Sequence, residues 1–464
     1  MTQTLQTVGD LRTSGWRSRS VKQELRDNLV TRLRGGKPVF SGIIGYEDTV
    51  VPQIENAILS GHDVIFLGER GQAKTRMARL LVELLDEQMP VIAGCEINDD
   101  PFAPICRACR EALATKGDGV PIAWLPRDRR YGEKLATPDI TIADLIGEVD
   151  PIKVAEGRYL SDELTIHYGL LPRTNRGIFT INELPDFAER IQVGLLNIME
   201  ERDVQIRGYK VRLPLDLYVV ASANPEDYTN RGRIITPLKD RFGSQIRTHY
   251  PRKLADEITI MDAERNRFAD EGVETVVPAY MKQVVAEMTH LARKATEINQ
   301  RSGVSVRVSI ANYENVLSNA LKRAIRLGER TVTPRVSDLV AVAASTSGKI
   351  ELETLGETGE DKVLAKLAQK AVLNVFNRTF PGAELEDVVK AFAAGLRMDV
   401  GDAMPATDYV RQAGEVRPLH LAARKLGATE PAEIAAAVEF VLEGLHLSKK
   451  LNKDVVGGQL RYRS

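Results

Sequence analysis

A loop with the composition of a phosphate-binding loop is the clearest chemical signal in the sequence. It lies between an expected strand and an expected helix, and it matches the pattern G-x-x-x-x-G-K-[ST] except that Ala73 replaces the last glycine. In such a loop, backbone N–H groups surround phosphate oxygens, Lys74 contacts the β- and γ-phosphates, and the hydroxyl of Thr75 binds Mg²⁺. A glycine-rich turn with an exposed lysine is the alternative explanation. The candidate nucleotide-binding residues are Gly68, Glu69, Arg70, Gly71, Gln72, Ala73, Lys74 and Thr75.

Polar residues follow two further expected strands and could complete such a site. Asn182 and Glu183 end the strand expected at 177–181, and Asn224 follows the strand expected at 217–222. At strand ends of this kind, one acid can hold the water shell of Mg²⁺ and a second can polarise an attacking water. Asn182 carries no charge, although its amide oxygen can accept a hydrogen bond from a metal-bound water. We therefore expect Mg²⁺–nucleotide binding with slow hydrolysis, and an ordinary strand end is the alternative.

Three cysteines lie close together in the sequence and could bind a metal ion. The spacing Cys106-x-x-Cys109 suits two thiolates on one Zn²⁺, and Cys95 could be a third ligand. His167 lies in the same stretch, but no spacing indicates that it reaches the cysteines. Three ordinary reduced cysteines are the alternative. A redox pair is less favoured because no thioredoxin-like strand precedes Cys106.

The elements that must position these residues alternate between strands and helices in the first half of the chain. Such alternation is typical of a parallel α/β sheet. After residue 254 the pattern is helical only, apart from an acidic, glycine-bearing stretch at 348–361. A hairpin is expected at 204–213, with its turn near Gly208. The expected strands are 64–67, 90–92, 177–181, 217–222 and 245–250, and the expected helices of this part are 21–33, 74–86 and 188–200.

These patterns divide the chain into four segments. We expect an N-terminal helical segment at 1–38, an α/β nucleotide-binding domain at 39–253, a helical lid at 254–347 and a C-terminal helical region at 348–464. The stretch at about 94–175 is long, proline-bearing and without clear periodicity, so it is expected to be a functional insertion in the second segment.

Composition disfavours several classes of function. The chain has 464 residues, with 63 Lys and Arg against 64 Asp and Glu, which argues against a wholesale polyanion binder. Aromatic residues make up 5%, which disfavours a platform for base stacking. No apolar run approaches about 18 residues, so no membrane span is expected. Residues 1–20 lack the apolar segment of a secretory signal, and a reducing cytoplasm is the expected location.

The order of these motifs resembles that of the AAA+ ATPases, and more narrowly that of the clade holding magnesium chelatase subunit I and the MoxR ATPases. The resemblance covers roughly residues 39–347. Ala73 is a change that MoxR-type loops also show. Three further segments carry the resemblance, namely Phe40 to Gly45 as the adenine-side segment, Leu145 to Asp150 with Gly157, Arg158 and Gly169 to Leu171 as the helix-2 insertion of chelatases, and Met199 to Val204 with the following hairpin as the pre-sensor hairpin.

The resemblance implies a fold, cofactors and residue roles. The fold is a P-loop AAA+ core with a five-stranded parallel sheet, an all-α lid and an additional C-terminal helical region. The cofactors are ATP and Mg²⁺. An arginine finger acts on the ATP of a neighbouring subunit, so a homo-oligomeric ring, a hexamer in this family, is implied. The implied roles are Ile44 and Gly45 beside adenine, Thr75 and, through water, Asn182 at Mg²⁺, Glu183 as the catalytic glutamate, Asn224 as the sensor 1 residue that places the attacking water, Arg241 as the arginine finger and Arg307 as the sensor 2 residue.

The implied function is that of an ATP-driven ring motor that remodels a partner protein, usually one with a von Willebrand factor A domain. The motor subunit of a true magnesium chelatase, which inserts metal into protoporphyrin IX, is one alternative, although Asn182 and the segment after residue 348 favour the chaperone side. A nucleotide-gated binding module with little hydrolysis is a second alternative. A nucleic-acid-associated ATPase is a third, and it is disfavoured because the seven basic residues within 231–253 are more simply explained as a subunit interface facing ATP.

Overall fold

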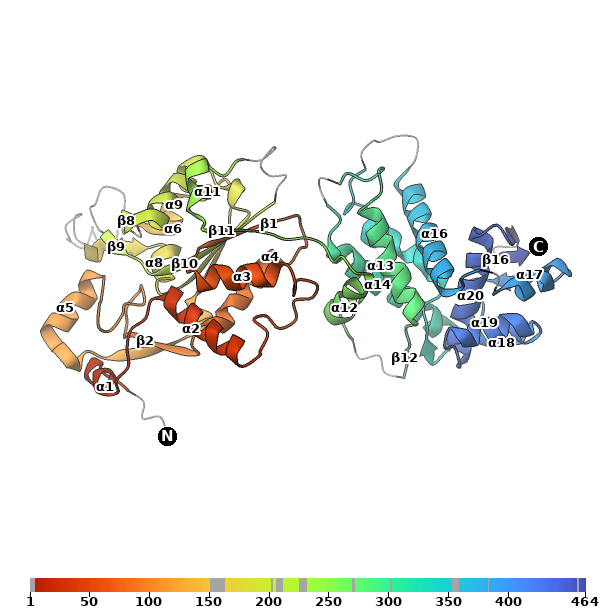
Figure 1. The fold of residues 1–464 in the computed structure, drawn as a ribbon, viewed down its shortest axis with the longest axis horizontal. Coiled ribbons are helices and arrows are strands. Elements are labelled where there is room, and N and C mark those ends of the chain that lie inside the picture. The colour runs from red at the N-terminus through yellow and green to blue at the C-terminus, as the bar shows by residue number, and fades with distance from the viewer. Residues whose placement is uncertain are drawn as a thin grey trace. The chain divides into compact units, whose positions relative to one another are not determined.

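The computed structural model shows two compact units, residues 1–249 and 250–464 (Figure 1). Each unit has its own arrangement of helices and strands. The described residues are 5–150, 163–201, 203–205, 212–224, 232–268, 272–300, 303–352, 359–382, 384–456 and 459–464.

A five-stranded sheet forms the centre of the first unit, and every neighbouring pair of its strands is parallel. The prediction of an α/β fold with a five-stranded parallel sheet is therefore confirmed. The two strands β7 and β10 are buried along their whole length, which is typical of a parallel sheet covered on both faces. In spatial order the strands are β11 (Ser244–Arg247), β1 (Val64–Leu67), β10 (Leu217–Ala223), β7 (Gly177–Asn182) and β4 (Tyr131–Leu135).

The membership of the sheet differs from expectation at one edge. The segment expected as a strand at 90–92 is one, β2 (Gln88–Ile92), but it pairs antiparallel with β3 (Ile122–Pro126) in a separate two-stranded sheet. The fifth strand of the main sheet is β4, which lies inside the stretch expected to be an insertion. As an edge strand, β4 buries only Gly132 and has no apolar run, so it lacks the sequence signal of a buried strand.

Helices cover both faces of this sheet, and alternate residues of β1 point to the two sides. Val64 and Phe66 pack with α2 (Val21–Arg34), α3 (Val50–Leu59) and α4 (Lys74–Leu80) in one apolar cluster. The next residues along, Ile65 and Leu67, pack on the opposite face. That second cluster includes residues of α6 (Ile142–Ile146), α9 (Glu189–Glu201) and α11 (Thr236–Arg241), and Figure 1 shows α9 and α11 across the sheet from α2 and α3.

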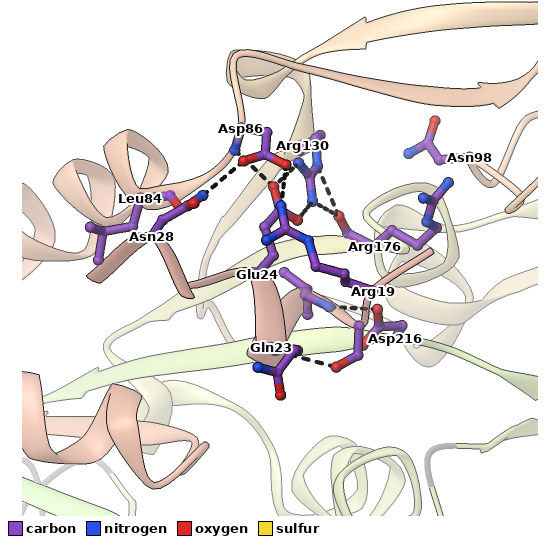
Figure 2. A network of polar contacts seen from close by, with 12 residues as sticks. Arg19, Gln23, Glu24, Asn28, Leu84, Asp86, Asn98, Arg130, Arg176 and Asp216 are labelled. Atoms are coloured by element: carbon purple, nitrogen blue, oxygen red, sulfur yellow. Dashed lines mark hydrogen bonds and ion pairs between the residues drawn. The ribbon is translucent and has the colours of Figure 1, made fainter. Parts of the chain in front are cut away.

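The N-terminal helix α2 is joined to this unit by a buried ion pair. The guanidinium of Arg130 donates to both carboxylate oxygens of Glu24, at 2.7 and 2.6 Å, and to the backbone carbonyl of Arg176 (Figure 2). Arg130 and Glu24 are both buried. At the start of α2, the N–H of Val21 donates to Asp216 at 2.7 Å. Helix α2, which lies in the expected N-terminal segment 1–38, therefore packs as part of the α/β unit.

Smaller elements complete the first unit. The hairpin expected at 204–213 is present as an antiparallel pair of β8 (Asp203–Gln205) and β9 (Arg212–Pro214), and its turn at Gly208 lies outside the described residues. A second antiparallel pair consists of β5 (Gly147–Val149) and β6 (Ile166–Tyr168). Gly157, Arg158 and Arg202 also lie outside the described residues. The other helices are α1 (Val8–Thr13), α5 (Arg107–Lys116) and α8 (Leu170–Arg173), with single 3₁₀ turns at Leu81–Leu84, Gly117–Gly119, Arg127–Arg130, Glu163–Thr165 and Leu184–Asp186.

The second unit is mainly helical. Its main apolar cluster includes residues from helices on both sides of residue 348, with α20 as the most buried helix, and two smaller clusters lie beside it. A three-stranded antiparallel sheet in the last third of the chain was not expected, and it has the order β14 (Met398–Val400), β16 (Gln459–Arg463) and β15 (Asn452–Val456). No described helix in the chain is long and apolar enough to span a membrane. The helices are α12 (Leu254–Glu264), α13 (Ala279–Ala292), α14 (Val306–Leu327), α15 (Val342–Thr346), α16 (Glu360–Thr379), α17 (Glu386–Ala393), α18 (Ala406–Gly414), α19 (Arg417–Lys425) and α20 (Pro431–Leu447), and a short parallel pair joins β12 (Glu274–Thr275) to β13 (Thr331–Val332).

Candidate nucleotide-binding site

Three central strands of the parallel sheet end at the same edge. Leu67 of β1 pairs with Ala223 of β10, and the N–H of Gly68 donates to the Ala223 carbonyl at 3.1 Å. On the other side of β10, Ala221 pairs with Ile181 of β7. The carboxyl edge of a parallel sheet is where such folds bind ligands. The register therefore brings the loop after β1 to the same edge as the residues that follow β7 and β10.

The loop after β1 has the strained backbone of a tight strand-to-helix turn. Gly71 and Ala73 have φ of +76° and +56°, so both lie in the left-handed region. For alanine this conformation costs roughly 1–2 kcal/mol, which the surrounding contacts must offset. Lys74 begins α4 and is buried, and its ammonium group donates to the carbonyls of Gly68 and Glu69, at 2.9 Å for Glu69. The lysine charge therefore lies within the loop.

Two hydrogen bonds connect this loop to the rest of the unit. The hydroxyl of Thr248 donates to the side chain of Gln72 at 2.6 Å. The hydroxyl of Tyr46 lies 3.0 Å from the carbonyl oxygen of Gln72 and 2.6 Å from that of His249, and burial raises the pKa of Tyr46 to about 12. Tyr46 follows directly on Ile44 and Gly45, the residues expected beside adenine. The structure therefore joins the expected adenine-side segment to the phosphate loop.

A chain of oxygen-bearing side chains lies where Mg²⁺ is expected. The hydroxyl of Thr75 donates to Asn182 Oδ1 at 3.2 Å, and Asn182 Nδ2 donates to Glu133 Oε1 at 2.6 Å. The hydroxyl of Ser222 lies 3.4 Å from the same Asn182 oxygen. The hydrogen bond to Glu133 orients the amide, because the nitrogen must face the carboxylate and the oxygen must then face Thr75. The structure therefore brings together both residues expected at Mg²⁺.

Glu133 is a component of this site that the sequence did not indicate. It lies on edge strand β4, whose Leu135 pairs with Asn182 of β7. Arg79 of α4 donates to both oxygens of Glu133, at 2.8 and 2.9 Å. Partial burial opposes ionisation, but the hydrogen bonds from Arg79 and its neighbours hold the pKa of Glu133 below its ordinary value. A carboxylate is thus hydrogen-bonded to Asn182, whose own side chain is an uncharged amide.

The two residues expected to act on water lie at the same edge. Glu183 is half-buried and has φ of +54°, and its N–H donates to Ser222 at 3.3 Å. Asn224 is buried directly after β10. Because β7 and β10 are adjacent, the two side chains come from neighbouring strand ends.

The two arginines with expected roles lie on the surfaces of different units. Arg241 is the last residue of α11, and its guanidinium, with 34% of the side chain exposed, forms ion pairs with Glu200 and Asp240. Arg307 is exposed in the first turn of α14, where its N–H donates to the N-cap residue Ser305 at 3.1 Å.

A cavity of about 410 Å³ adjoins the phosphate loop. Its volume is within the usual range for small-molecule sites. Two basic residues, Lys239 and Arg247, contribute to its wall together with the loop. The cavity can therefore hold an anionic ligand against the loop. It is lined by Leu67, Gly68, Glu69, Gln72, Lys239, Arg247 and Thr248.

The three cysteines gather in a different part of the first unit. Cys95, Cys106 and Cys109 converge with Asp99, which the sequence did not indicate as a partner. His167 is exposed on β6, where it lies 3.3 Å from Arg173, and it does not belong to this group. Spacing alone could not reveal Asp99, because the loop conformation after β2 brings it to the cysteines.

Comparison with known proteins gives consistent relatives. No family model matches the chain. It is 28% identical over 232 residues to a magnesium-chelatase subunit ChlI homolog of Methanocaldococcus jannaschii, covering 48% of this chain and 58% of that protein. It is 24% identical over 335 residues to magnesium-chelatase subunit ChlI of Nephroselmis olivacea, covering 67% of this chain and 88% of that protein. A match to subunit ChlI-1 of Arabidopsis thaliana has 27% identity and covers 51% of this chain and 54% of the relative.

Several of these matches span only a little over half the length of the relative. Among solved structures, a complex of magnesium chelatase subunits BchI and BchD is 20% identical, with a TM-score of 0.36 and coverage of 68% of this chain and 97% of that one. The sequence relatives, the parallel sheet and the loop after β1 agree with the family that the motifs indicated. The chain is thus similar to magnesium-chelatase ChlI subunits, in agreement with the AAA+ family that its motifs resemble.

Proposed function

We propose that this protein is an ATPase that works as the motor subunit of a homo-oligomeric ring and remodels a partner protein. The observation that carries the proposal is the hydrogen-bonded series from Thr75 through Asn182 to Glu133, beside the phosphate loop. This series combines a phosphate-binding loop with oxygen ligands at one sheet edge. Such a combination supports binding of a nucleotide together with a divalent cation.

Nucleotide binding is supported by the loop and the adjoining cavity. Backbone N–H groups of residues 68–75 would surround the phosphates, with Lys74 beside the β- and γ-phosphates. Lys239 and Arg247 in the cavity wall add positive charge. Ile44 and Gly45 would lie beside adenine, on the segment that Tyr46 connects to the loop.

The donor set near Thr75 fits Mg²⁺. A hydroxyl, an amide oxygen and a carboxylate are hard oxygen ligands, which this ion prefers, directly or through its bound waters. When bound, Mg²⁺ would neutralise phosphate charge. Thr75 would hold it, Asn182 would accept from its waters, and Glu133 would supply the negative charge that Asn182 lacks. Glu133 is therefore proposed as a positioning residue.

Hydrolysis is assigned to Glu183, which would accept a proton from the attacking water, and Asn224, which would orient that water. The amide at position 182 leaves less negative charge beside the ion than an acid would, so slow turnover is proposed. Arg241 would reach the ATP of the neighbouring subunit, and Arg307 would act as the sensor 2 residue of the lid at 254–347. A head-to-tail ring, a hexamer in this family, would provide that contact.

The partner is proposed to carry a von Willebrand factor A domain, and the location to be the cytoplasm, both on the family resemblance. Two other functions have specific support. The names of the relatives favour the motor subunit of a true magnesium chelatase. The uncharged Asn182 favours a nucleotide-gated binding module with little hydrolysis.

Substitution of the catalytic glutamate separates these functions. We expect Glu183→Gln to keep ATP binding and to lower ADP production by roughly 10²- to 10⁴-fold. Lys74→Ala is expected to lose ATP binding, and Glu189→Gln, an exposed acid at the start of α9, is the matched control. A wild-type protein that releases no more ADP than Glu183→Gln would contradict the motor and leave the binding module. Proteins retained by an ATP-loaded Glu183→Gln ring would identify the partner.

A further inference from the structure

Four side chains outside the nucleotide site each direct one ligand atom to a common point. The sulfur atoms of Cys95, Cys106 and Cys109 and a carboxylate oxygen of Asp99 all lie within 4.8 Å of one another. In a tetrahedral zinc site with Zn–S bonds of about 2.3 Å, the sulfur atoms are about 3.8 Å apart. The four groups therefore already have nearly the spacing that one zinc ion requires.

Local backbone contacts hold the ligands in this arrangement. Cys106 is the N-cap residue of α5, and the N–H of Cys109 donates to its sulfur at 3.4 Å. The N–H of Asp99 donates to the sulfur of Cys95, also at 3.4 Å. N–H donors and a helix N-terminus favour the thiolate form of cysteine, which is the form that binds metals.

The carboxylate of Asp99 provides an independent indication of a cation. Asp99 is fully buried, and its Oδ2 accepts the N–H of Cys106 at 3.0 Å. Its Oδ1 is also buried, and no donor in the described part of the chain reaches it. A buried carboxylate oxygen without a partner is costly. A cation bound among the three sulfur atoms would offset the cost of burying this carboxylate.

The chemistry of the ligands selects the ion. Three thiolates favour Zn²⁺ over Mg²⁺ or Ca²⁺, and three thiolates with one carboxylate have the formal charge of the common four-cysteine zinc site. All four positions are filled by protein groups, which is typical of a structural site. A cavity of about 330 Å³ adjoins the cluster.

We propose that Cys95, Asp99, Cys106 and Cys109 bind one Zn²⁺, which fixes the start of α5 to the loop that leaves β2. The ion would fasten α5 to the loop after β2, inside the connection that leads from β2 to β3. The site is separate from the ATPase chemistry, since its ligands come from a different loop.

Elemental analysis of the full-length protein, purified without chelators, tests the site directly. We expect about one zinc per chain, and Co²⁺ in its place should give thiolate-to-cobalt charge-transfer absorption. A chelator should make the three thiols more reactive in the wild-type protein, a readout that does not depend on a variant folding. Zinc near zero, even after growth and dialysis with added zinc, would overturn the proposal, as would a Cys106–Cys109 disulfide in the purified protein.

Variants test the individual ligands. Cys106→Ser is expected to lose zinc, and Asp99→Asn to bind it more weakly in competition with a chromophoric chelator. Glu96→Gln is the matched control, because Glu96 is an exposed acid in the same loop that lies outside the group of four. Unchanged zinc affinity in Asp99→Asn would remove Asp99 from the site. Equal zinc loss in Glu96→Gln would show that the loss reflects general damage to the loop and would contradict the assignment.

Discussion

At the scale of single residues, Asn182 occupies the position where the family resemblance leads us to expect an acid. The acid Glu133 lies directly beside it. The two side chains are joined by a hydrogen bond of 2.6 Å. If Glu133 supplies the missing charge, Glu133→Gln should raise the Mg²⁺ concentration needed for half-maximal ATPase activity by roughly tenfold or more. Adding Asn182→Asp should restore the wild-type requirement, because one negative charge returns to the same pair of positions. Magnesium titrations of the ATPase rate measure both effects.

The control for this experiment is Glu87→Gln, which removes an exposed acid of the same unit. It should leave the Mg²⁺ requirement unchanged. An unchanged requirement in Glu133→Gln would instead limit Glu133 to an ion pair with Arg79.

Residue types and spacing predicted much of the candidate site. The loop at 68–75, Asn182, Glu183 and Asn224 were indicated because each directly follows a recognisable apolar strand, and the strands prove to end together. Glu133 and Asp99 could not be predicted in this way. Glu133 reaches Asn182 through the register of β4 with β7, and Asp99 reaches the cysteines through a loop conformation; neither leaves a periodic signal.

At the scale of elements, the buried pair of Glu24 and Arg130 contributes to the attachment of α2, together with the packing of its apolar residues in the core. Glu24→Gln keeps the shape of the side chain but leaves the Arg130 charge uncompensated in the interior, so we expect a loss of about 3–5 kcal/mol in the free energy of unfolding. Both tryptophans, Trp16 and Trp124, lie in the first unit, so urea unfolding followed by tryptophan fluorescence reports on this unit.

The matched control is Asp118→Asn at the exposed ion pair with Arg12, where both side chains are more than half exposed. Surface pairs contribute about 0–1 kcal/mol, so little change is expected. Equal effects of Glu24→Gln and Asp118→Asn would mean that the buried pair does not hold α2.

In the second unit, Glu257 connects three helices. It lies on α12 and accepts hydrogen bonds from Arg293, after α13, at 2.8 and 3.0 Å, and from Ser309 of α14. Burial alone would raise its pKa, but the nearby His290 imidazole and the hydrogen bonds from Arg293 and Ser309 outweigh it and lower the pKa of Glu257 to about 2. Because the folded value is the lower one, the stabilisation is complete above the unfolded value of about 4.5 and is lost as the pH falls towards 2.

The lowered pKa of Glu257 corresponds to a contribution of about 3 kcal/mol to the free energy of unfolding. We therefore expect protection of the α12 and α14 amides from hydrogen exchange, corrected for the intrinsic rate, to fall as the pH is lowered from about 5 to about 3. In Glu257→Gln, protection should be lower at the higher pH and should vary less over this range. A pH dependence identical to that of the wild type would contradict the role of Glu257.

Element prediction failed where packing, and not local pattern, decides the structure. The strand at 64–67 and the helix at 21–33 were predicted because an apolar run and an apolar stripe mark them, and both form. Strand β4 was not predicted, because its sequence mixes polar and apolar residues and only one of them is buried. It forms a strand through its pairing with β7. The three-stranded sheet at the C-terminus was missed for a similar reason, since β15 is mostly exposed and depends on its pairing with β16.

At the scale of the whole molecule, the proposed ring makes a prediction about mixed subunits. If Arg241 acts on the neighbouring ATP, rings mixed equally from Glu183→Gln and Arg241→Ala subunits contain some sites that have both residues. Random assembly makes these about a quarter of all sites, so the mixture should hydrolyse ATP faster than either variant alone. ATPase rates measured after subunit exchange test this.

A mixture of Lys74→Ala with Glu183→Gln is the control. Lys74 and Glu183 of one site come from the same subunit. Every site in these mixed rings therefore carries one of the two substitutions. No recovery is expected there. Absence of recovery in the first mixture as well would mean that Arg241 does not act between subunits.

The position of β1 in the sheet has a consequence for synthesis of the protein. Val64 pairs with Val220 on one side and with Ser244 on the other, so both neighbours are translated more than 150 residues later. At roughly 5–20 residues per second, the apolar strand remains without a partner for roughly 8–30 s. Pairings between such distant segments also slow folding, and an unpaired apolar strand favours aggregation during that time. The nascent chain therefore has its greatest need of chaperone protection before β10 leaves the ribosome.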